Sequence, residues 1–334
     1  MIATKSICIA GAGSIGCFAG GVLAAAGRDV RLLARPRIIE QILSHGLRVT
    51  DIDGLDCRVA ARQLRLSDTA ELMQGVGAVL VTVKSADTAE VAGLIARHAP
   101  DDAVIVSLQN GVGNVAVLSE RLPGRVVLGG MVPFNVMSLS DAHFHRATSG
   151  AVIVEHDAAG TAAALSVPHF AVRPTDDIIG VQWGKLLINL NNALNALSGL
   201  PLREQLAQRA WRFLIADQMM EALAVLKAAG IRPVSPTPVP ARMTPALLRL
   251  PDALFALVLG RTMKIDASAR SSMWEDLQDG RRTEIDYLQG VVVELAGRTG
   301  LRIPLTRHVV NLIRRAEQAG KGSPGLTAAD IRES

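Results

Sequence analysis

The sequence predicts an α/β protein, in which an N-terminal doubly wound parallel sheet is followed by an all-α C-terminal domain. Near the start of the chain, an apolar run leads directly into a glycine-rich turn, 11–16. Further apolar runs of strand length alternate with helical segments, which is typical of a parallel sheet. From Thr175 onward nearly every segment has helical periodicity, so we expect two domains, residues 1–174 and residues 175–334.

The glycine-rich turn lies between a predicted strand, Ser6–Ala10, and a predicted helix, Cys17–Ala26. In that context G-x-G-x-x-G indicates a dinucleotide-binding, Rossmann-like domain. Gly11 permits the tight turn, Gly13 lets a pyrophosphate approach the backbone, and Gly16 lets the helix pack closely on the strand. The helix start then holds the pyrophosphate through its unpaired N–H groups and positive dipole. The predicted cofactor contacts in this turn are Gly11, Ala12, Gly13, Ser14, Ile15 and Gly16.

The next predicted strand, Val30–Ala34, is followed by Arg35 and shortly afterwards by Arg37. An NAD-dependent enzyme usually has an acidic residue here, which bonds the ribose 2′-hydroxyl. A guanidinium instead matches a 2′-phosphate through paired, charge-assisted hydrogen bonds. We therefore predict that the cofactor is NADPH and that Arg35 contacts it. The alternative is that Arg35 is a solvated surface residue.

The middle of the chain predicts a hairpin, further parallel strands and a set of edge strands. The hairpin turns at Asp53-Gly54, a strong turn dipeptide, and the last parallel strand is expected to end at Gly129-Gly130. Three further apolar runs are expected to extend the edge of the parallel sheet as antiparallel strands. The runs, in chain order, are 47–50 and 57–60 for the hairpin, 78–83, 103–108 and 125–128 for the parallel strands, and 132–137, 143–147 and 151–155 for the edge.

Two polar residues follow neighbouring predicted strands. Lys84 comes after the run 78–83, and Asn110 comes after the run 103–108, within Gln109-Asn110-Gly111. Ligands of open α/β sheets bind beyond the carboxyl ends of the strands. Lys84 would then hold an anionic group of cofactor or substrate, and Asn110 would bond the ribose or the reacting carbonyl. The alternatives are a solvated lysine and the ordinary turn chemistry of an Asn-Gly pair.

In the second domain, a polar row lies within the apolar segment Trp183–Asn192. Lys185, Asn189 and Asn192 follow at helical spacing, so a helix here puts them on one face. These side chains are costly to bury without partners, and the alternative is a solvated polar stripe. We favour a buried row that faces a site, because apolar residues surround it widely. The proline-rich segment 233–251 is expected to be an extended loop between helices.

Composition argues against several classes of partner. The net charge is only +4, and aromatic residues make up 3% of the chain, so a nucleic-acid-binding surface is not expected. No uncharged apolar run reaches membrane-spanning length, and the glycine turn leaves no room for a signal peptide. The three cysteines have neither metal nor disulfide spacing. We expect a cytoplasmic protein with a small-molecule ligand and no metal, nucleic-acid or membrane partner, and we leave open a homodimer.

Taken together, these motifs resemble those of the ketopantoate reductases (2-dehydropantoate 2-reductases), which reduce a 2-oxo acid with NADPH. The resemblance spans nearly the full length of the chain. The matching segments, in order, are Gly11–Gly16, Lys84, Gln109-Asn110-Gly111, Trp183-x-Lys185-Leu186 with Asn189, Ser271-Ser272-Met273 and Arg282-Thr283-Glu284-Ile285-Asp286. Without the resemblance, the last two of these segments would be interpreted as a helix cap and an exposed helical turn.

The resemblance implies reduction of 2-dehydropantoate to pantoate by hydride transfer, with Lys185 as the general acid. An unperturbed lysine has a pKa of about 10.4 and carries a proton at neutral pH. The resemblance also implies that Lys84, Asn110 and Glu284 contact the cofactor, and that Glu284 belongs to the catalytic pair with the lysine. The substrate contacts that it implies are Asn110, Lys185, Asn189 and Ser272.

The chain departs from the family pattern where the substrate is expected to bind. The position that usually holds a second substrate asparagine is Ala193, and the nearest amide is Asn192, which we include among the predicted substrate contacts. No asparagine occurs in Leu200–Glu204, and Gly129–Met137 also differs from the usual family sequence. One alternative is therefore a reductase of a different small 2-oxo or β-keto acid. A second is a non-catalytic NADPH-binding regulator, although a sensor needs no proton donor such as Lys185.

Overall fold

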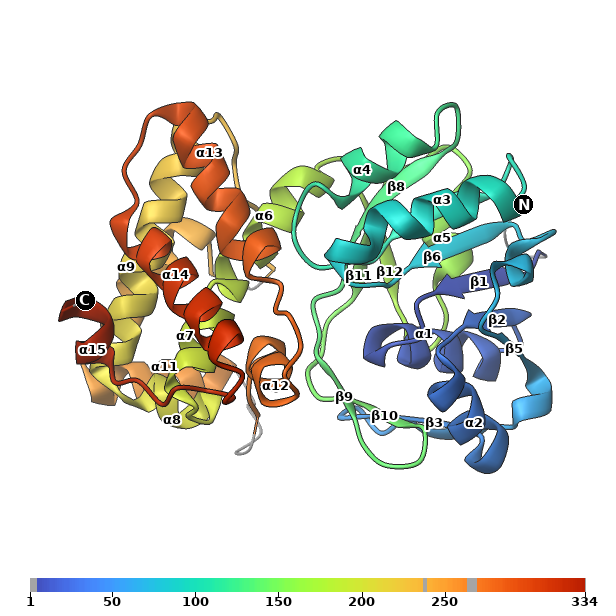
Figure 1. Cartoon of the computed structure of the whole chain (residues 1–334), viewed down its shortest axis with the longest axis horizontal. Coiled ribbons are helices and arrows are strands. Elements are labelled where there is room, and N and C mark those ends of the chain that lie inside the picture. The colour runs from blue at the N-terminus through green and yellow to red at the C-terminus, as the bar shows by residue number, and fades with distance from the viewer. Residues whose placement is uncertain (1–4, 237–238, 263–268, 334) are drawn as a thin grey trace. The chain divides into compact units, whose positions relative to one another are not determined.

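The computed structural model describes residues 5–236, 239–262 and 269–333. It divides into two compact units, residues 1–179 and residues 180–334 (Figure 1). Unit 1 is built on β-sheets with helices, and unit 2 is helical, so the predicted fold class is confirmed. The domain boundary after residue 174 stays a prediction. Within the described ranges, no helix is both long and apolar enough to cross a membrane.

The main sheet of unit 1 has the strand order β12-β11-β8-β7-β6-β1-β2-β5. Along β1, Ile7 and Ile9 enter one apolar core, whereas Cys8 and Ala10 enter the core on the opposite face. Both faces are thus covered, as a parallel sheet requires. The strands are β1 (Ile7–Ala10), β2 (Val30–Leu33), β5 (Leu64–Ser67), β6 (Ala78–Val81), β7 (Val104–Ser107), β8 (Val127–Met131), β11 (Val152–Glu155) and β12 (Val172–Thr175).

Two glycines that we expected to end a strand are part of it. β8 continues through Gly129 and Gly130 to Met131 and pairs there with β11. A Cβ at Gly130 would lie 2.6 Å from the carbonyl oxygen of Ser107 on the neighbouring strand. The glycine is therefore explained by a close approach of two backbones rather than by a turn.

A second sheet has the order β4-β3-β10-β9. Its strands are β3 (Leu47–Asp51), β4 (Asp56–Val59), β9 (Val136–Ser138) and β10 (His143–Arg146). The predicted hairpin is confirmed as β3 and β4. The prediction that all three later runs extend the main sheet is wrong, because β10 pairs with β3 and only β11 joins the main sheet. Arg146 of β10 and Asp51 of β3 form a buried ion pair at 2.7 Å, which links strands that are far apart in sequence.

The helices of unit 1 connect the parallel strands and cover the main sheet. Figure 1 shows α3 and α4 on one side of this sheet and α1 on the other. Parallel pairing of β7, β6, β1 and β2 brings their carboxyl ends to one edge. The helices are α1 (Ser14–Ala25), α2 (Pro36–His45), α3 (Thr88–His98), α4 (Asn114–Arg121) and α5 (Thr161–Leu165), with short 3-10 turns at Ala61–Gln63, Ala70–Met73 and Ser85–Asp87.

Unit 2 is a set of packed helices whose core includes the fully buried Val225, Val292 and Ile313. The proline-rich segment, expected as an extended loop, contains a 3-10 turn and α10, so that prediction is wrong for residues 241–248, whereas residues 233–236 and 239–240 are not helical. The helices are α6 (Ile178–Asn189), α7 (Asn191–Ser198), α8 (Leu202–Ala207), α9 (Arg209–Ala228), α10 (Thr244–Leu248), α11 (Asp252–Thr262), α12 (Ser272–Gln278), α13 (Val291–Thr299), α14 (Pro304–Ala319) and α15 (Ala328–Glu333), with the 3-10 turn Ala241–Met243 and the π-helix Asp286–Gly290.

The helix predicted over residues 183–192 is two helices that meet at Leu190. The backbone of Leu190 is still helical (φ −57°, ψ −29°), and its N–H donates to the carbonyl of Leu186 at 2.9 Å. Its own carbonyl accepts the side-chain amide of Gln289 at 2.8 Å. A buried side chain from a distant segment therefore bonds the backbone at the point where α6 ends.

Candidate active site

The predicted cofactor residues of unit 1 gather at one edge of the main sheet. The glycine turn follows β1, and Arg35 follows β2. Lys84 comes after β6, and Asn110 comes after β7. Because these four strands are parallel neighbours, the structure brings together segments that are far apart in sequence.

Tight backbone contacts hold the glycine turn in its shape. Gly11 has a φ of +108°, and a Cβ there would lie 2.7 Å from the backbone nitrogen of Val83. A Cβ at Gly16 would lie 2.3 Å from the carbonyl oxygen of Gly11, and no side-chain rotation relieves a clash with backbone. The hydroxyl of Thr82 donates to the same carbonyl at 2.6 Å. Sequence reasoning missed Thr82, although a hydroxyl within an apolar strand run is a signal that could have found it.

Gly13 differs from the other two glycines because it is exposed and has open space beside it. A Cβ at Gly13 would meet no atom within 4 Å. The helix α1 that follows has no side-chain cap and no acidic residue in its first turn. The first N–H groups of a helix have no intrahelical partner, and together with the bare backbone they fit the pyrophosphate of a dinucleotide.

Arg35 combines a fixed backbone with an exposed side chain. Its carbonyl accepts the N–H groups of Ile38 and Ile39 at 2.9 and 3.2 Å, which starts α2. The N–H of Ala12 in the glycine turn donates to the carbonyl of Leu33 at 3.0 Å, at the end of the strand that leads to Arg35. The guanidinium therefore extends from a position tied to the dinucleotide turn, which is where a ribose 2′-substituent is expected.

In unit 2, Lys185 and Asn189 lie four residues apart on α6. Lys185 is half-buried, and Asn189 is buried. Desolvation lowers the pKa of the Lys185 ammonium from 10.5 to about 8. Asn192, the third member of the predicted row, lies beyond the break at Leu190, in α7, and is half-buried.

Ser272 is brought beside α7 by the residue that precedes it. Ser271 is the N-cap of α12, where its hydroxyl oxygen accepts the N–H of Trp274 at 3.2 Å. The same hydroxyl donates to the carbonyl of Asn192 at 2.9 Å. Ser271 is thus a helix cap, as one interpretation of the sequence predicted. Its bond to Asn192 also places the exposed Ser272 next to α7.

Glu284 is half-buried and lies two residues before the start of the π-helix. Its carbonyl accepts the N–H groups of Tyr287 and Leu288 at 3.0 and 3.1 Å. Gln289, within the π-helix, donates to Leu190 and so links this segment to the end of the lysine helix. π-Helical turns are frequent at functional sites. Sequence reasoning missed Gln289, because no local pattern distinguishes it from a surface glutamine.

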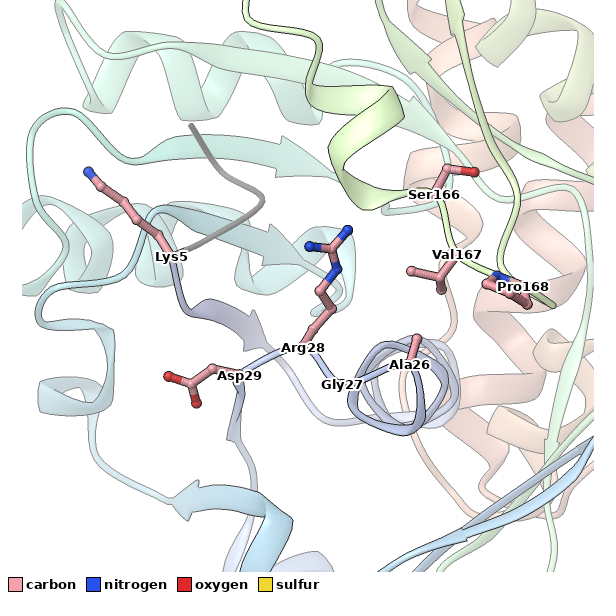
Figure 2. A pocket seen from close by; sticks show the side chains of 8 residues that line it. All are labelled: Lys5, Ala26, Gly27, Arg28, Asp29, Ser166, Val167 and Pro168. Atoms are coloured by element: carbon pink, nitrogen blue, oxygen red, sulfur yellow. The ribbon is translucent and has the colours of Figure 1, made fainter.

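A hollow of about 380 Å³ in unit 1 lies at the amino ends of β1 and β2, away from the glycine turn (Figure 2). Its cations are paired: Lys5 with Asp102 at 2.7 Å, and Arg28 with the carbonyl of Ala164 at 3.0 Å. We therefore do not assign the cofactor to this hollow. The residues that line it are Lys5, Ala26, Gly27, Arg28, Asp29, Ser166, Val167 and Pro168.

A Rossmann-like sheet with an uncapped glycine turn, followed by a helical unit with a desolvated lysine, defines a two-domain oxidoreductase of the nicotinamide-dependent class. Residues 7–158 match the family Ketopantoate reductase PanE/ApbA, and residues 177–317 match its C-terminal domain. The chain belongs to the ketopantoate reductase family.

Relatives support this assignment along more than nine-tenths of the chain. The chain is 30% identical over 331 residues to a 2-dehydropantoate 2-reductase of Halobacterium salinarum, an alignment that covers 94% of this chain and 99% of the relative. A second 2-dehydropantoate 2-reductase, from Archaeoglobus fulgidus, is 27% identical over 325 residues and is covered to 97%, against 92% of this chain.

Solved structures agree on the fold. A PanE/ApbA family ketopantoate reductase from Ralstonia eutropha JMP134 has a TM-score of 0.80 and 29% identity, covering 95% of this chain and 99% of its own. A D-mandelate dehydrogenase, solved with NADH and anilino(oxo)acetate, has a TM-score of 0.77 and covers 94% of this chain and 99% of its own. Its 19% identity shows a shared fold alone.

Proposed function

We propose that this protein reduces 2-dehydropantoate to pantoate with NADPH, and that Lys185 is the general acid. The observation that carries the proposal is the desolvated lysine of α6, with a pKa of about 8. Such a lysine is still mostly protonated at neutral pH but gives up its proton more readily than an ordinary lysine, as a general acid should. Family membership and the names of the relatives support the substrate.

In this proposal, NADPH binds to unit 1. The bare backbone at Gly13 and the start of α1 would hold the pyrophosphate, and Arg35 would bond the 2′-phosphate. Lys84 and Asn110, which follow β6 and β7, would also contact the cofactor. When bound, the nicotinamide supplies the hydride, and the protein orients the reactants and polarises the carbonyl.

Lys185 acts on the oxygen of the substrate carbonyl. As the carbonyl carbon gains a hydride, negative charge develops on that oxygen, and the ammonium of Lys185 stabilises this charge. The Nζ proton then passes to the oxygen, so the ketone becomes an alcohol and the lysine becomes neutral. Positioned proton transfer of this kind contributes about 10²–10⁴-fold to the rate. Glu284, proposed to lie beside the lysine and the cofactor, would favour the charged ammonium.

Polar side chains are proposed to hold the substrate in the ground state. Their amide and hydroxyl groups suit the carboxylate and hydroxyl of ketopantoate. The proposed substrate contacts are Asn110, Lys185, Asn189, Asn192 and Ser272.

A panel of 2-oxo acids, assayed by the loss of NADPH absorbance, tests the proposal. We expect the highest kcat/KM for ketopantoate. Efficient turnover of another acid with none of ketopantoate would reject the proposed substrate.

A second candidate is a reductase of a different small 2-oxo or β-keto acid. Ala193 is fully buried where the family usually has a substrate asparagine, and the backbone of the neighbouring Asn192 is engaged by Ser271. A site with fewer amides would suit a substrate with fewer polar groups. The same panel, extended to β-keto acids, decides between the two candidates.

A non-catalytic NADPH-binding regulator is the third reading. Such a regulator would need the residues of unit 1, but the desolvated lysine would have no role in it. Tight NADPH binding without reduction of any carbonyl compound in a broad panel would favour it.

A further inference from the structure

A buried polar network lies beneath Lys84 and Asn110. Both of these side chains are exposed, whereas the adjacent Ser85 and Gln109 are buried. The hydroxyl of Ser85 donates to the carbonyl of Asn110 at 3.1 Å. The loop after β6 is therefore bonded directly to the loop after β7, on the buried side of the two exposed residues.

Asn114, at the start of α4, is the centre of this network. It is 6% exposed. Its side-chain nitrogen donates to the carbonyl of Asn110 at 2.9 Å and to the hydroxyl of Ser85 at 3.2 Å. Its side-chain oxygen accepts the hydroxyl of Thr88 at 2.9 Å. One amide thus bonds the loop after β6, the loop after β7 and the first residue of α3.

Thr88 and Gln109 extend the network. Thr88 is 1% exposed, and its hydroxyl oxygen accepts the side-chain amide of Gln109 at 2.7 Å. The side-chain oxygen of Gln109 accepts the hydroxyl of Ser107 at 3.0 Å. Buried polar groups are costly unless they are bonded, and a bonded network of this kind specifies one geometry.

We infer that Asn114 is a positioning residue, which holds the two loops in register and so fixes Lys84 and Asn110 for the cofactor. The inference rests on the proposed function, because it takes unit 1 as the NADPH-binding unit. The two loops follow different strands, and Asn114 bonds both. Its loss leaves only the bonds of Ser85 to Asn110 and of Gln109 to Thr88 to hold them in register. A residue that merely stabilised α4 would not need to bond the carbonyl of Asn110.

Asn114→Asp is the sharpest test, because the side chain keeps its shape. The oxygen that faces Thr88 remains, whereas the donor that faces the carbonyl of Asn110 becomes an acceptor and repels it. We expect the Kd of NADPH, measured by fluorescence, to rise at least about 10-fold, which corresponds to about 1.4 kcal/mol. Asn114→Ala removes the same bonds without adding charge and serves if the aspartate variant does not fold.

Val91→Ala is the matched control. Val91 is buried in α3, outside the network, and the substitution lowers stability through a cavity. A structural role for Asn114 predicts that both variants lose stability and that neither changes the Kd of NADPH in the folded protein. A raised Kd for Asn114→Asp alone supports positioning, and an unchanged Kd in a folded Asn114 variant overturns it.

A double-mutant cycle with Asn110→Ala asks whether Asn114 acts through Asn110. Positioning predicts that the Asn114→Asp effect on the Kd shrinks when the Asn110 side chain is already absent. Full additivity would contradict action through Asn110. Hydrogen exchange of the cofactor-free protein gives an independent readout, and we expect faster exchange in residues 85–88 and 110–114 of the variant.

The outcomes separate this inference from the proposed function. If the wild-type protein does not bind NADPH, the proposed function fails in its cofactor, and the exchange measurement still decides whether Asn114 holds the loops. If the wild-type protein binds NADPH and the folded Asn114 variants bind it equally well, only the positioning inference fails.

Discussion

The side-chain oxygen of Asn195 accepts the backbone N–H of Ser271 at 2.8 Å. Asn195 is fully buried in α7, and its side-chain nitrogen donates to the carbonyl of Leu200 at 2.9 Å and to Gln205 at 3.1 Å. One amide therefore holds the start of α12, and with it Ser272, against α7.

Asn195→Ala should release this contact. Leaving buried partners unsatisfied costs about 1–3 kcal/mol of unfolding free energy. We expect the KM of the keto acid to rise several-fold because Ser272 is then held against α7 only through the Ser271 hydroxyl. The Kd of NADPH should not change. Denaturant unfolding and steady-state kinetics measure the two effects. Asn191→Ala, in the same helix but without a bond to α12, is the control, and a normal KM in folded Asn195→Ala would contradict the assignment.

Substitution of Lys185 should affect the chemical step rather than cofactor binding. We expect Lys185→Ala to lower kcat by about 10²-fold or more with a nearly unchanged Kd of NADPH, because the ammonium acts chiefly on charge that develops in the transition state. Lys185→Arg should also be impaired, since a guanidinium keeps the charge but does not release its proton. Lys227→Ala, an exposed lysine of α9, is the control. Near-normal kcat in a variant that is folded by circular dichroism would remove Lys185 from the mechanism.

The pKa of Lys185 predicts opposite pH profiles for the two directions of the reaction. Reduction needs the protonated lysine, so kcat/KM should be high below pH 8 and fall as the pH rises through about 8. Oxidation of the alcohol needs the neutral lysine, so its rate should rise over the same range. An ordinary lysine would shift both limbs to about pH 10. Profiles of both directions between pH 6 and pH 10 would show which holds.

Arg35→Ala should reduce the preference for NADPH over NADH. A hydrogen bond to a charged group contributes about 1.5–3 kcal/mol, so NADPH binding should weaken about 10- to 150-fold while NADH binding is spared. Titration of both cofactors measures the change. Arg298→Ala, an exposed arginine of α13, is the control. Equal losses for both cofactors, or none, would mean that Arg35 does not bind the 2′-phosphate.

Gly13→Ala should separate cofactor binding from folding. The added methyl meets no atom of the protein within 4 Å, so the melting temperature should stay close to that of the wild type. The methyl would occupy the space proposed for the pyrophosphate, and we expect the Kd of NADPH to rise at least about 10-fold. Gly297→Ala, in α13 and equally open, is the control and should leave the Kd unchanged. Wild-type affinity in Gly13→Ala would argue against this turn as the pyrophosphate site.

Local patterns were sufficient for much of the fold and for most of the candidate residues, whereas Ser272 and Glu284 were implied only by the family resemblance. The apolar runs before Lys84 and Asn110 predicted neighbouring parallel strands, and the structure confirms that β6 pairs with β7. These apolar runs are reliable signals because the residues that mark a buried strand are adjacent in sequence. The role of each site residue stays a prediction.

What the sequence determined by itself is the α/β class, the glycine turn after β1 and the order of the polar residues along the chain. Only the tertiary structure decided which strands β9 and β10 would join, where the lysine helix breaks and how far the pKa of Lys185 falls. The first two of these depend on contacts between residues that are far apart in sequence, namely Arg146 with Asp51 and Gln289 with Leu190. Desolvation likewise sums over all the atoms packed around one nitrogen, and no local pattern contains that sum.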